Sequence, residues 1–376
     1  MPRKRRADRP LPGRLMRFWW RFAVVGIIVY VGYTIWLGGA YRSVEAFTAG
    51  QCVAVPAPPG PEDMAVLPDG PGLLPGAIVS SQDRRDRTAP GGLYFYDLSS
   101  RPGTFTRLET PASMVLHPHG LSLFTAPDGQ SFLHVINHRS SDRHTVEIFA
   151  VQQDAGSVPV LRHRGSVSSD LFVHPNGIAA AGPESFYLTN DRGSGPGWMH
   201  MVENLLQLAR STVVYHDGRG ARVVADNIAF ANGIEISADG GTVLVGSTQW
   251  RMIMAYTREA TSGMLLRSGS LALPGGADNI RRDANGELWV AAHANAFAFI
   301  GHAMNAEKES PSMILRLSRN ARGAIQTSEA FSDPGDMLSG ASVGVQHQGR
   351  LLVGAVFQPT VLDCQLDEAK LREIEN

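Results

Sequence analysis

The sequence predicts an all-β fold, a six-bladed β-propeller, preceded by one N-terminal transmembrane helix. Three observations predict it: a short motif that recurs about six times, strand-like segments between Gly turns, and one uncharged apolar run near the N-terminus. Repeats of 46 to 63 residues that are rich in short strands are typical of propellers, with about one blade per repeat. The motif copies are Glu62-Asp63-Met64, His119-Gly120-Leu121, Asn176-Gly177-Ile178, Asn232-Gly233-Ile234, Asp278-Asn279-Ile280 and a faded copy, Ala341-Ser342-Val343.

The N-terminal segment joins a basic tail to an apolar run. Arg and Lys dominate residues 1–18, and an uncharged stretch from Phe22 to Ala40 follows. A helix of that length spans a bilayer, and its basic flank should stay in the cytoplasm. We therefore expect a cytoplasmic tail over 1–18, a transmembrane signal anchor over 19–41, a connector over 42–51 and the propeller over 52–376. The propeller would lie on the periplasmic or extracellular side. A cleaved signal peptide is the alternative.

Charge and cysteine content restrict the partners and the compartment. The net charge of the 376 residues is −1, and because the N-terminus is basic, the remainder is acidic. No basic stripe is present, which argues against nucleic acid as a partner. Cys52 and Cys364 flank the repeats, and a propeller closes its ring by pairing terminal strands. We expect a disulfide between them, as export would allow, with two buried free thiols as the alternative.

Strand-like segments dominate the repeat region. They are short, β-branched or aromatic, and bounded by turns, at 93–96, 132–136, 145–149, 242–245 and 288–290. Trp198 to Leu208 has helical spacing instead, which predicts a short helix over the active-site end of the propeller. That helix could be a lid or a membrane-facing element, or it could simply pack on the end of the barrel. The stretch 303–311 is polar and predicts an exposed loop.

The first residues of the motif copies predict a cation site on the propeller axis. If each copy opens an inner strand, its leading side chain points at the central channel. Five residues would then supply oxygen atoms and two negative charges: Glu62, Asn176, Asn232, Asp278 and Asn279. Calcium prefers carboxylate and amide oxygens. The alternative is that each Asn-Gly or Asp-Gly pair is only a hairpin turn, as we expect for Asp128, Asp239 and Asn285.

Histidines near the same end of the channel could transfer protons. His119 leads the second motif copy, and His138 ends strand 132–136 in the same blade. Adjacent antiparallel strands could bring the two together, so that one imidazole takes a proton from water and the other orients it. His293 follows the fifth inner repeat and could line the same mouth. The sequence contains no zinc-spaced cluster, EF-hand, phosphate loop or serine-nucleophile elbow.

Several of these segments together resemble the serum paraoxonase/arylesterase family. They include 117–122, 135–138, 145–149, 230–234 and 278–280, and the resemblance runs from about Cys52 to Cys364. It implies a six-bladed propeller, calcium, and hydrolysis of lactones and aryl esters. Matched by motif, the same five residues become the calcium ligands, His119 and His138 the catalytic dyad, His293 a pocket residue, and Cys52–Cys364 the disulfide.

The resemblance has one departure. It implies a second, structural calcium ion bound by Asp63, by the backbone carbonyl of Leu121, and by an acidic side chain at the position of Gly177. Because glycine has no carboxylate, we expect one catalytic calcium ion and a weakened or absent second site.

The function expected from the sequence is calcium-dependent hydrolysis of a lactone or aryl ester. The metal would polarise the carbonyl, and water activated by His119 and His138 would attack it. Asp278 is a rival base or nucleophile, and Phe230 and Phe297 would make an apolar pocket. Two alternatives stay open: a sugar-lactone hydrolase without the His pair, and a non-enzymatic, membrane-tethered propeller that binds calcium.

Overall fold

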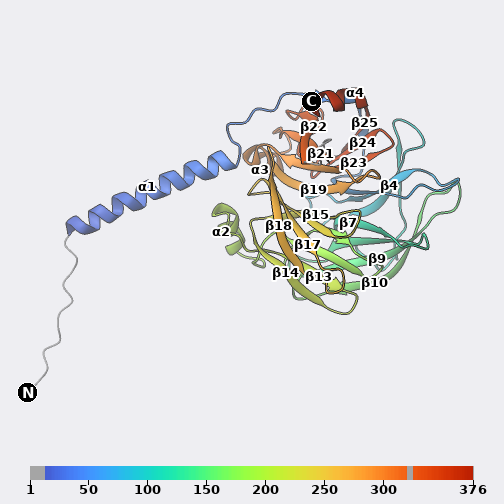
Figure 1. Cartoon of the computed structure of the whole chain (residues 1–376), viewed down its shortest axis with the longest axis horizontal. Helices are drawn as coiled ribbons and strands as arrows, with labels where there is room; N and C mark the ends of the chain where they lie inside the picture. The colour runs from blue at the N-terminus through green and yellow to red at the C-terminus, as the bar shows by residue number, and fades with distance from the viewer. Residues whose placement is uncertain (1–12, 320–324, 376) are drawn as a thin grey trace, which may run out of the picture.

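The computed structural model describes residues 13–319 and 325–375, and within them six antiparallel sheets surround a central axis (Figure 1). The six-bladed propeller predicted from the sequence is therefore confirmed. The first two blades comprise β3 (Pro61–Val66), β4 (Gly76–Ser81), β5 (Gly92–Asp97) and β6 (Thr104–Arg107), then β7 (Pro118–Thr125), β8 (Ser131–His138), β9 (His144–Gln152) and β10 (Val160–Ser168). The next two comprise β11 (Pro175–Ala180), β12 (Ser185–Asn190), β13 (Ser211–Asp217) and β14 (Ala221–Ile228), then β15 (Ala231–Ile236), β16 (Thr242–Ser247), β17 (Met252–Arg258) and β18 (Leu265–Ala272).

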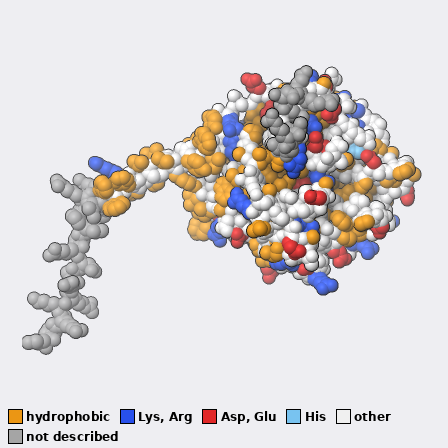
Figure 2. Space-filling model, in the orientation of Figure 1, with side chains coloured by type: hydrophobic (Ala, Val, Ile, Leu, Met, Phe, Trp, Pro, Cys, Tyr) orange, Lys and Arg blue, Asp and Glu red, His pale blue; other side chains and the backbone are white. Residues whose placement is uncertain are grey.

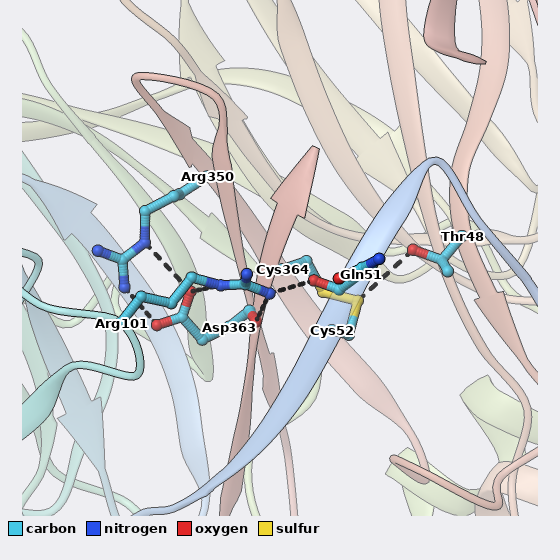
Figure 3. Close-up of a disulfide and its surroundings, with 7 residues drawn as sticks. All are labelled: Thr48, Gln51, Cys52, Arg101, Arg350, Asp363 and Cys364. Atoms are coloured by element: carbon cyan, nitrogen blue, oxygen red, sulfur yellow. Dashed lines mark hydrogen bonds and ion pairs between the residues drawn. A yellow bond between two sulfur atoms is a disulfide. The ribbon is translucent and has the colours of Figure 1, made fainter. Parts of the chain in front are cut away.

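The last two blades take strands from both ends of the chain. The fifth blade has β19 (Gly276–Arg282), β20 (Leu288–His293), β21 (Ser312–Arg319) and β22 (Ile325–Asp333), with β1 (Phe47–Thr48) on its outer edge. The sixth has β23 (Ala341–His347), β24 (Arg350–Ala355), β25 (Thr360–Leu366) and, outermost, β2 (Gly50–Pro56). Cys52 pairs with Cys364 in the β2–β25 register, and the two form a disulfide (Figure 3). The predicted disulfide is confirmed, and it closes the ring.

Every motif copy lies in an inner strand at a β-bulge. In all six blades the register between the innermost strand and its neighbour shifts at the motif, for example between Pro61 and Asp63 and between Pro175 and Ile178. A bulge leaves residues outside the ladder and re-aims their side chains. In five of the six blades the leading polar residue is thus left out of strand pairing. In the sixth, Ala341 pairs with Ala355 and Ser342 is left out.

The glycine at the second motif position allows the inner strands to pack closely. A Cβ at Gly120 would lie 2.4 Å from the carbonyl oxygen of Asn176, one at Gly177 would lie 2.5 Å from that of Asn232, and one at Gly233 would lie 2.3 Å from that of Asp278. No real Cβ tolerates such distances, so the leading residues of neighbouring blades are brought within backbone contact. The predicted turns at Asp128, Asp239 and Asn285 are also confirmed, since the glycine after each has φ between 70° and 85°.

Four helices lie outside the blades of the described chain. α1 (Gly13–Leu37) projects from the propeller, and its part Phe18–Leu37 is long and apolar enough to cross a membrane (Figure 1). α2 (Met199–Leu205) lies within the predicted helical stretch but is shorter than that stretch. α3 (Ala296–Met304) was not predicted, although Asn295 accepts hydrogen bonds from Phe297 N and Ala298 N as a typical N-cap. α4 (Glu368–Glu375) follows the last strand.

The hydrophobic core lies between neighbouring blades. Ile78 and Phe95 of the first blade pack with Leu133 and Phe149 of the second, and all four are fully buried. Similar clusters join the other blades in turn. Because the sheets bury both faces against their neighbours, the inner strands form a fixed frame for the residues that face the channel.

Candidate metal and catalytic centre

The leading motif residues form a connected ring around the channel. Glu62 contacts the second blade, since its Oε1 lies 2.7 Å from His119 Nε2. Across the ring, Asn279 Nδ2 donates to the Glu62 carbonyl at 3.2 Å, and Ser342 Oγ donates to the same carbonyl at 2.7 Å. With the close glycine contacts, these bonds bring together the residues expected to bind the metal: Glu62, Asn176, Asn232, Asp278 and Asn279.

Each of the three asparagines donates a hydrogen bond from its side-chain amide nitrogen, which leaves its amide oxygen to accept. Asn176 Nδ2 donates to Asp191 at 3.4 Å, Asn232 Nδ2 donates to Thr248 at 3.2 Å, and Asn279 Nδ2 donates to the Glu62 carbonyl. Asn232 Oδ1 is buried and has no partner among the described residues. A buried orphan acceptor is costly unless a ligand satisfies it, so the amide oxygens fit a hard cation.

The two carboxylates of the ring carry its negative charge. Burial alone would raise the pKa of Glu62, but Arg84 and His119 outweigh it and lower the pKa to about 2. Arg84 contacts Glu62 Oε2 through two nitrogens. Asp278 Oδ2 lies 2.9 Å from His293 Nε2, and both side chains are buried. No group of three or more His, Cys, Asp or Glu side chains that could hold a metal occurs in the described chain. A cation bound here would therefore need amide oxygens as well as carboxylates as ligands.

His119 and His138 are in direct contact. His119 Nδ1 lies 2.7 Å from His138 Nε2, while the other nitrogen of His119 faces Glu62. Burial, together with the positive charge of Arg84, lowers the pKa of His119 despite the opposing effect of Glu62. Burial also holds the pKa of His138 well below its ordinary value. Both imidazoles are thus neutral near pH 7, the form that can accept a proton.

Further residues extend this pair beyond what the sequence predicted. His138 Nδ1 lies 2.8 Å from His144 Nδ1, and the His174 ring stacks on His138 with centroids 5.5 Å apart. His174 Nδ1 in turn lies 2.8 Å from Asp191, whose Oδ2 accepts from Asn176. Sequence reasoning missed His144, although it follows His138 by six residues across a turn and pairs with it in the β8–β9 register.

The pocket residues are only partly brought together. His293 ends β20 and stacks on Phe299 of α3, with ring centroids 4.0 Å apart. Phe299, which the sequence did not single out, also packs on Phe357. Phe297 is about half exposed and lies instead against Gly38 at the end of α1. Phe230 precedes β15 with a φ of 53° and is partly buried.

The two residues expected at a second metal site contact an arginine. Arg281 Nη2 donates to the Leu121 carbonyl at 2.8 Å and pairs with Asp63 Oδ2, and Arg281 Nε donates to Asp63 Oδ1 at 3.0 Å. Burial raises the pKa of Asp63 to about 6 against the lowering effect of Arg281.

The chain is similar to several known proteins. A family model described as Arylesterase matches residues 52–366. Serum paraoxonase/arylesterase 1 of Mus musculus is 33% identical over 321 residues, which cover 82% of this chain and 86% of that protein. Serum paraoxonase/lactonase 3 of Homo sapiens is 28% identical with the same coverage. A solved gluconolactonase of Xanthomonas campestris is 16% identical, covers 87% of this chain and 99% of its own, and has a TM-score of 0.45. The chain is thus a member of the arylesterase family of ester hydrolases.

Proposed function

We propose that this ester hydrolase cleaves lactones and aryl esters at the channel mouth, with a calcium ion held by Glu62, Asn176, Asn232, Asp278 and Asn279. The contact between His119 and both Glu62 and His138 is the observation that carries the proposal. It links a neutral base directly to the oxygen ring. The printed names of the relatives, an arylesterase and a lactonase, agree with this substrate class.

The chain's own residues supply the proton transfers. Calcium, when bound, would act as a Lewis acid that polarises the substrate carbonyl. In the reacting complex a water molecule takes the place of Glu62 at Nε2 of neutral His119. That nitrogen removes a proton from the water as the water oxygen attacks the carbonyl carbon, and it returns the proton to the departing oxygen. His138 orients His119 through the 2.7 Å contact and stabilises its charged form. Asp278, with one oxygen engaged by His293, is assigned to the cation rather than to nucleophilic attack.

The propeller is proposed to work at a membrane surface on the non-cytoplasmic side. Arg251 Nη1 donates to the Leu37 carbonyl at 3.0 Å, and Ala296 N donates to the Gly38 carbonyl at 2.8 Å. Because these bonds join the end of α1 to the propeller, a retained anchor over 19–41 is supported over a cleaved one. The same bonds bring the anchor next to α3, whose Phe299 packs on His293.

The direct test is an assay of the full chain in detergent. We expect turnover of an aryl acetate and an aliphatic lactone in calcium, loss of turnover in excess chelator, and recovery when calcium is restored. Folded, calcium-loaded protein that turns over neither class would refute the proposal. Turnover of sugar lactones alone, unaffected by His119→Gln, would favour the alternative sugar-lactone hydrolase.

A further inference from the structure

Arg281 carries a positive charge across the channel. It belongs to β19 in the fifth blade, yet its guanidinium reaches β3 of the first blade and β7 of the second. The residue is buried, with 7% of its surface exposed. Blades one and two do not border blade five in the ring, so Arg281 reaches across the channel to strands that are not neighbours of its own.

The hydrogen-bond acceptors around this guanidinium come from three strands. Nε donates to Asp63 Oδ1 at 3.0 Å and to the Met64 carbonyl at 3.1 Å, and Nη1 donates to the Ile280 carbonyl at 2.9 Å. Nη2 donates to the Leu121 carbonyl and pairs with Asp63 Oδ2. A carboxylate with both oxygens turned inward, together with carbonyls from separate strands, is a donor set that hard divalent cations use.

We propose that Arg281 is a built-in replacement for a structural metal ion. Its guanidinium balances the buried charge of Asp63 and joins the blades that a second calcium ion would otherwise join. The resemblance implied such an ion at Asp63 and Leu121, and the residues present do not fit it. An ion there would have to displace a guanidinium that has five oxygen contacts.

Gly177 supports the same conclusion independently. A carboxylate at this position would complete a metal site, but a Cβ there would lie 2.5 Å from the carbonyl oxygen of Asn232. The strand spacing therefore leaves no room at this position for a side chain that could add a carboxylate ligand. The contacts of Arg281 are with Asp63, Met64, Ile280 and Leu121, and with none of the five proposed calcium ligands. The inference thus goes beyond the proposed function.

The test compares three variants of the full chain in detergent, by melting temperature in chelator and in millimolar calcium and by bound calcium per chain. Arg281→Ser removes the charge and opens space, so its Tm in chelator should fall by roughly 5–15 °C. Calcium should restore most of this loss, and the variant should bind one calcium more than the wild type. Arg281→Met fills the space without charge, so its Tm should fall and calcium should not restore it.

Arg350→Ser is the matched control. Arg350 also pairs with a buried aspartate, Asp363, but Arg101 lies near the same carboxylate and remains there (Figure 3). Its loss should lower Tm with no added calcium response.

Three outcomes would overturn the proposal: a wild type that retains two ions after dialysis, an Arg281→Ser variant as stable in chelator as the wild type, or one that gains neither stability nor an ion in calcium. If Arg281→Ser does not fold, the number of ions bound by Arg281→Lys tests the proposal instead. It keeps the charge, so an extra ion in that variant would also contradict the proposal. Because the readout is the difference in ions from the wild type, failure of the proposed catalytic site would be recognised separately, as a wild type without calcium.

Discussion

At the scale of single residues, His119 combines two properties that a general base needs. It is neutral near pH 7 because burial and Arg84 lower its pKa, and His138 holds its Nδ1 so that Nε2 points at Glu62, where a water molecule would take the place of the carboxylate. The repeat pattern predicted His119 because the motif recurs in phase. Arg84 and Asp191 could not be found in this way, since they follow other strands and have no counterpart in the motif.

Replacing His119 by Gln should lower kcat by roughly 10²–10⁴-fold, because the amide cannot accept the proton from water. His138→Gln should have a smaller effect, since it acts through His119. The control is His216→Gln. His216 lies near the C-terminal end of β13, and this variant should keep full turnover. Steady-state kinetics on a lactone measures all three, and a His119→Gln variant within twofold of the wild type would contradict the role given to His119.

Asp278→Ala should remove calcium affinity and turnover together, because it deletes one of the two carboxylates of the ring and leaves His293 without its partner. Calorimetric titration measures the calcium affinity of the variant and of the wild type, and a kinetic assay measures the turnover of each. Asp239→Ala, in an exposed turn, is the control and should change neither. Full turnover in Asp278→Ala would contradict the metal assignment.

His134 should make stability depend on pH. It is fully buried between the second and third blades, and burial lowers its pKa to about 4, against about 6.5 in the unfolded chain. Above pH 6.5 both states are neutral. As pH falls toward 4, only the unfolded state gains the proton, so the free energy of unfolding should decrease by about 3 kcal/mol.

Denaturant unfolding between pH 7 and pH 4 measures this effect. His134→Leu should show a shallower loss of stability than the wild type over that range. Equal slopes for the two proteins would contradict the contribution assigned to His134.

At the scale of elements, the bulges explain what the motif does. A strand without a bulge would alternate its side chains and pair its backbone throughout, whereas here the register shifts in all six inner strands. The sequence predicted the position of each inner strand but not its bulge, since a bulge changes pairing without changing hydrophobic periodicity. α3 was missed because its apolar residues follow a strand directly, and only the Asn295 cap marks its start.

Gly177→Ala tests the close packing of the inner strands. Its Cβ would meet the Asn232 carbonyl at 2.5 Å, so strand movement should lower stability by about 1–3 kcal/mol and weaken the calcium centre. Gly165→Ala is the matched control, because a Cβ in β10 would meet no atom within 4 Å. Thermal unfolding of both variants compares them, and an equally small change at the two positions would refute the packing role.

At the scale of the whole molecule, the ring is closed by β2, which pairs with β25 over seven positions around the disulfide. The sequence predicted this closure because the two cysteines flank the repeats. It did not predict the ion pairs that reinforce it. Arg101 and Arg350 both approach Asp363, next to Cys364, and they come from different blades (Figure 3).

Replacing Cys52 and Cys364 by Ser should lower stability by up to about 5 kcal/mol, because the bridge spans 312 residues and restricts the unfolded chain. The β2–β25 ladder should keep the fold intact. The midpoint of denaturant unfolding measures the loss. An unchanged midpoint would show that the ladder alone holds the ring closed.

Exposed apolar side chains gather along α1 and near the end of the propeller that it joins. Figure 2 shows hydrophobic side chains along α1 and where it meets the propeller, and Figure 1 places α2 and α3 on that side. Trp198, Met201 and Leu205 at α2 and Phe297, Ile300 and Met304 on α3 are exposed large apolar residues. The sequence left open whether its predicted helix was a lid or only packed on the barrel. The described helix exposes its apolar residues, and it lies on the side of the propeller from which α1 projects (Figure 1).

The closure by β2 also governs how the chain must be made. β2 emerges early in synthesis, but its partner β25 emerges some three hundred residues later. At a synthesis rate of about 5–20 residues per second, β2 stays an unpaired edge with a free thiol for roughly 15–60 s. The pairing of β2 with β25 in the sixth blade is therefore the final step of assembly. An enzyme that catalyses disulfide formation would act only on a nearly finished ring.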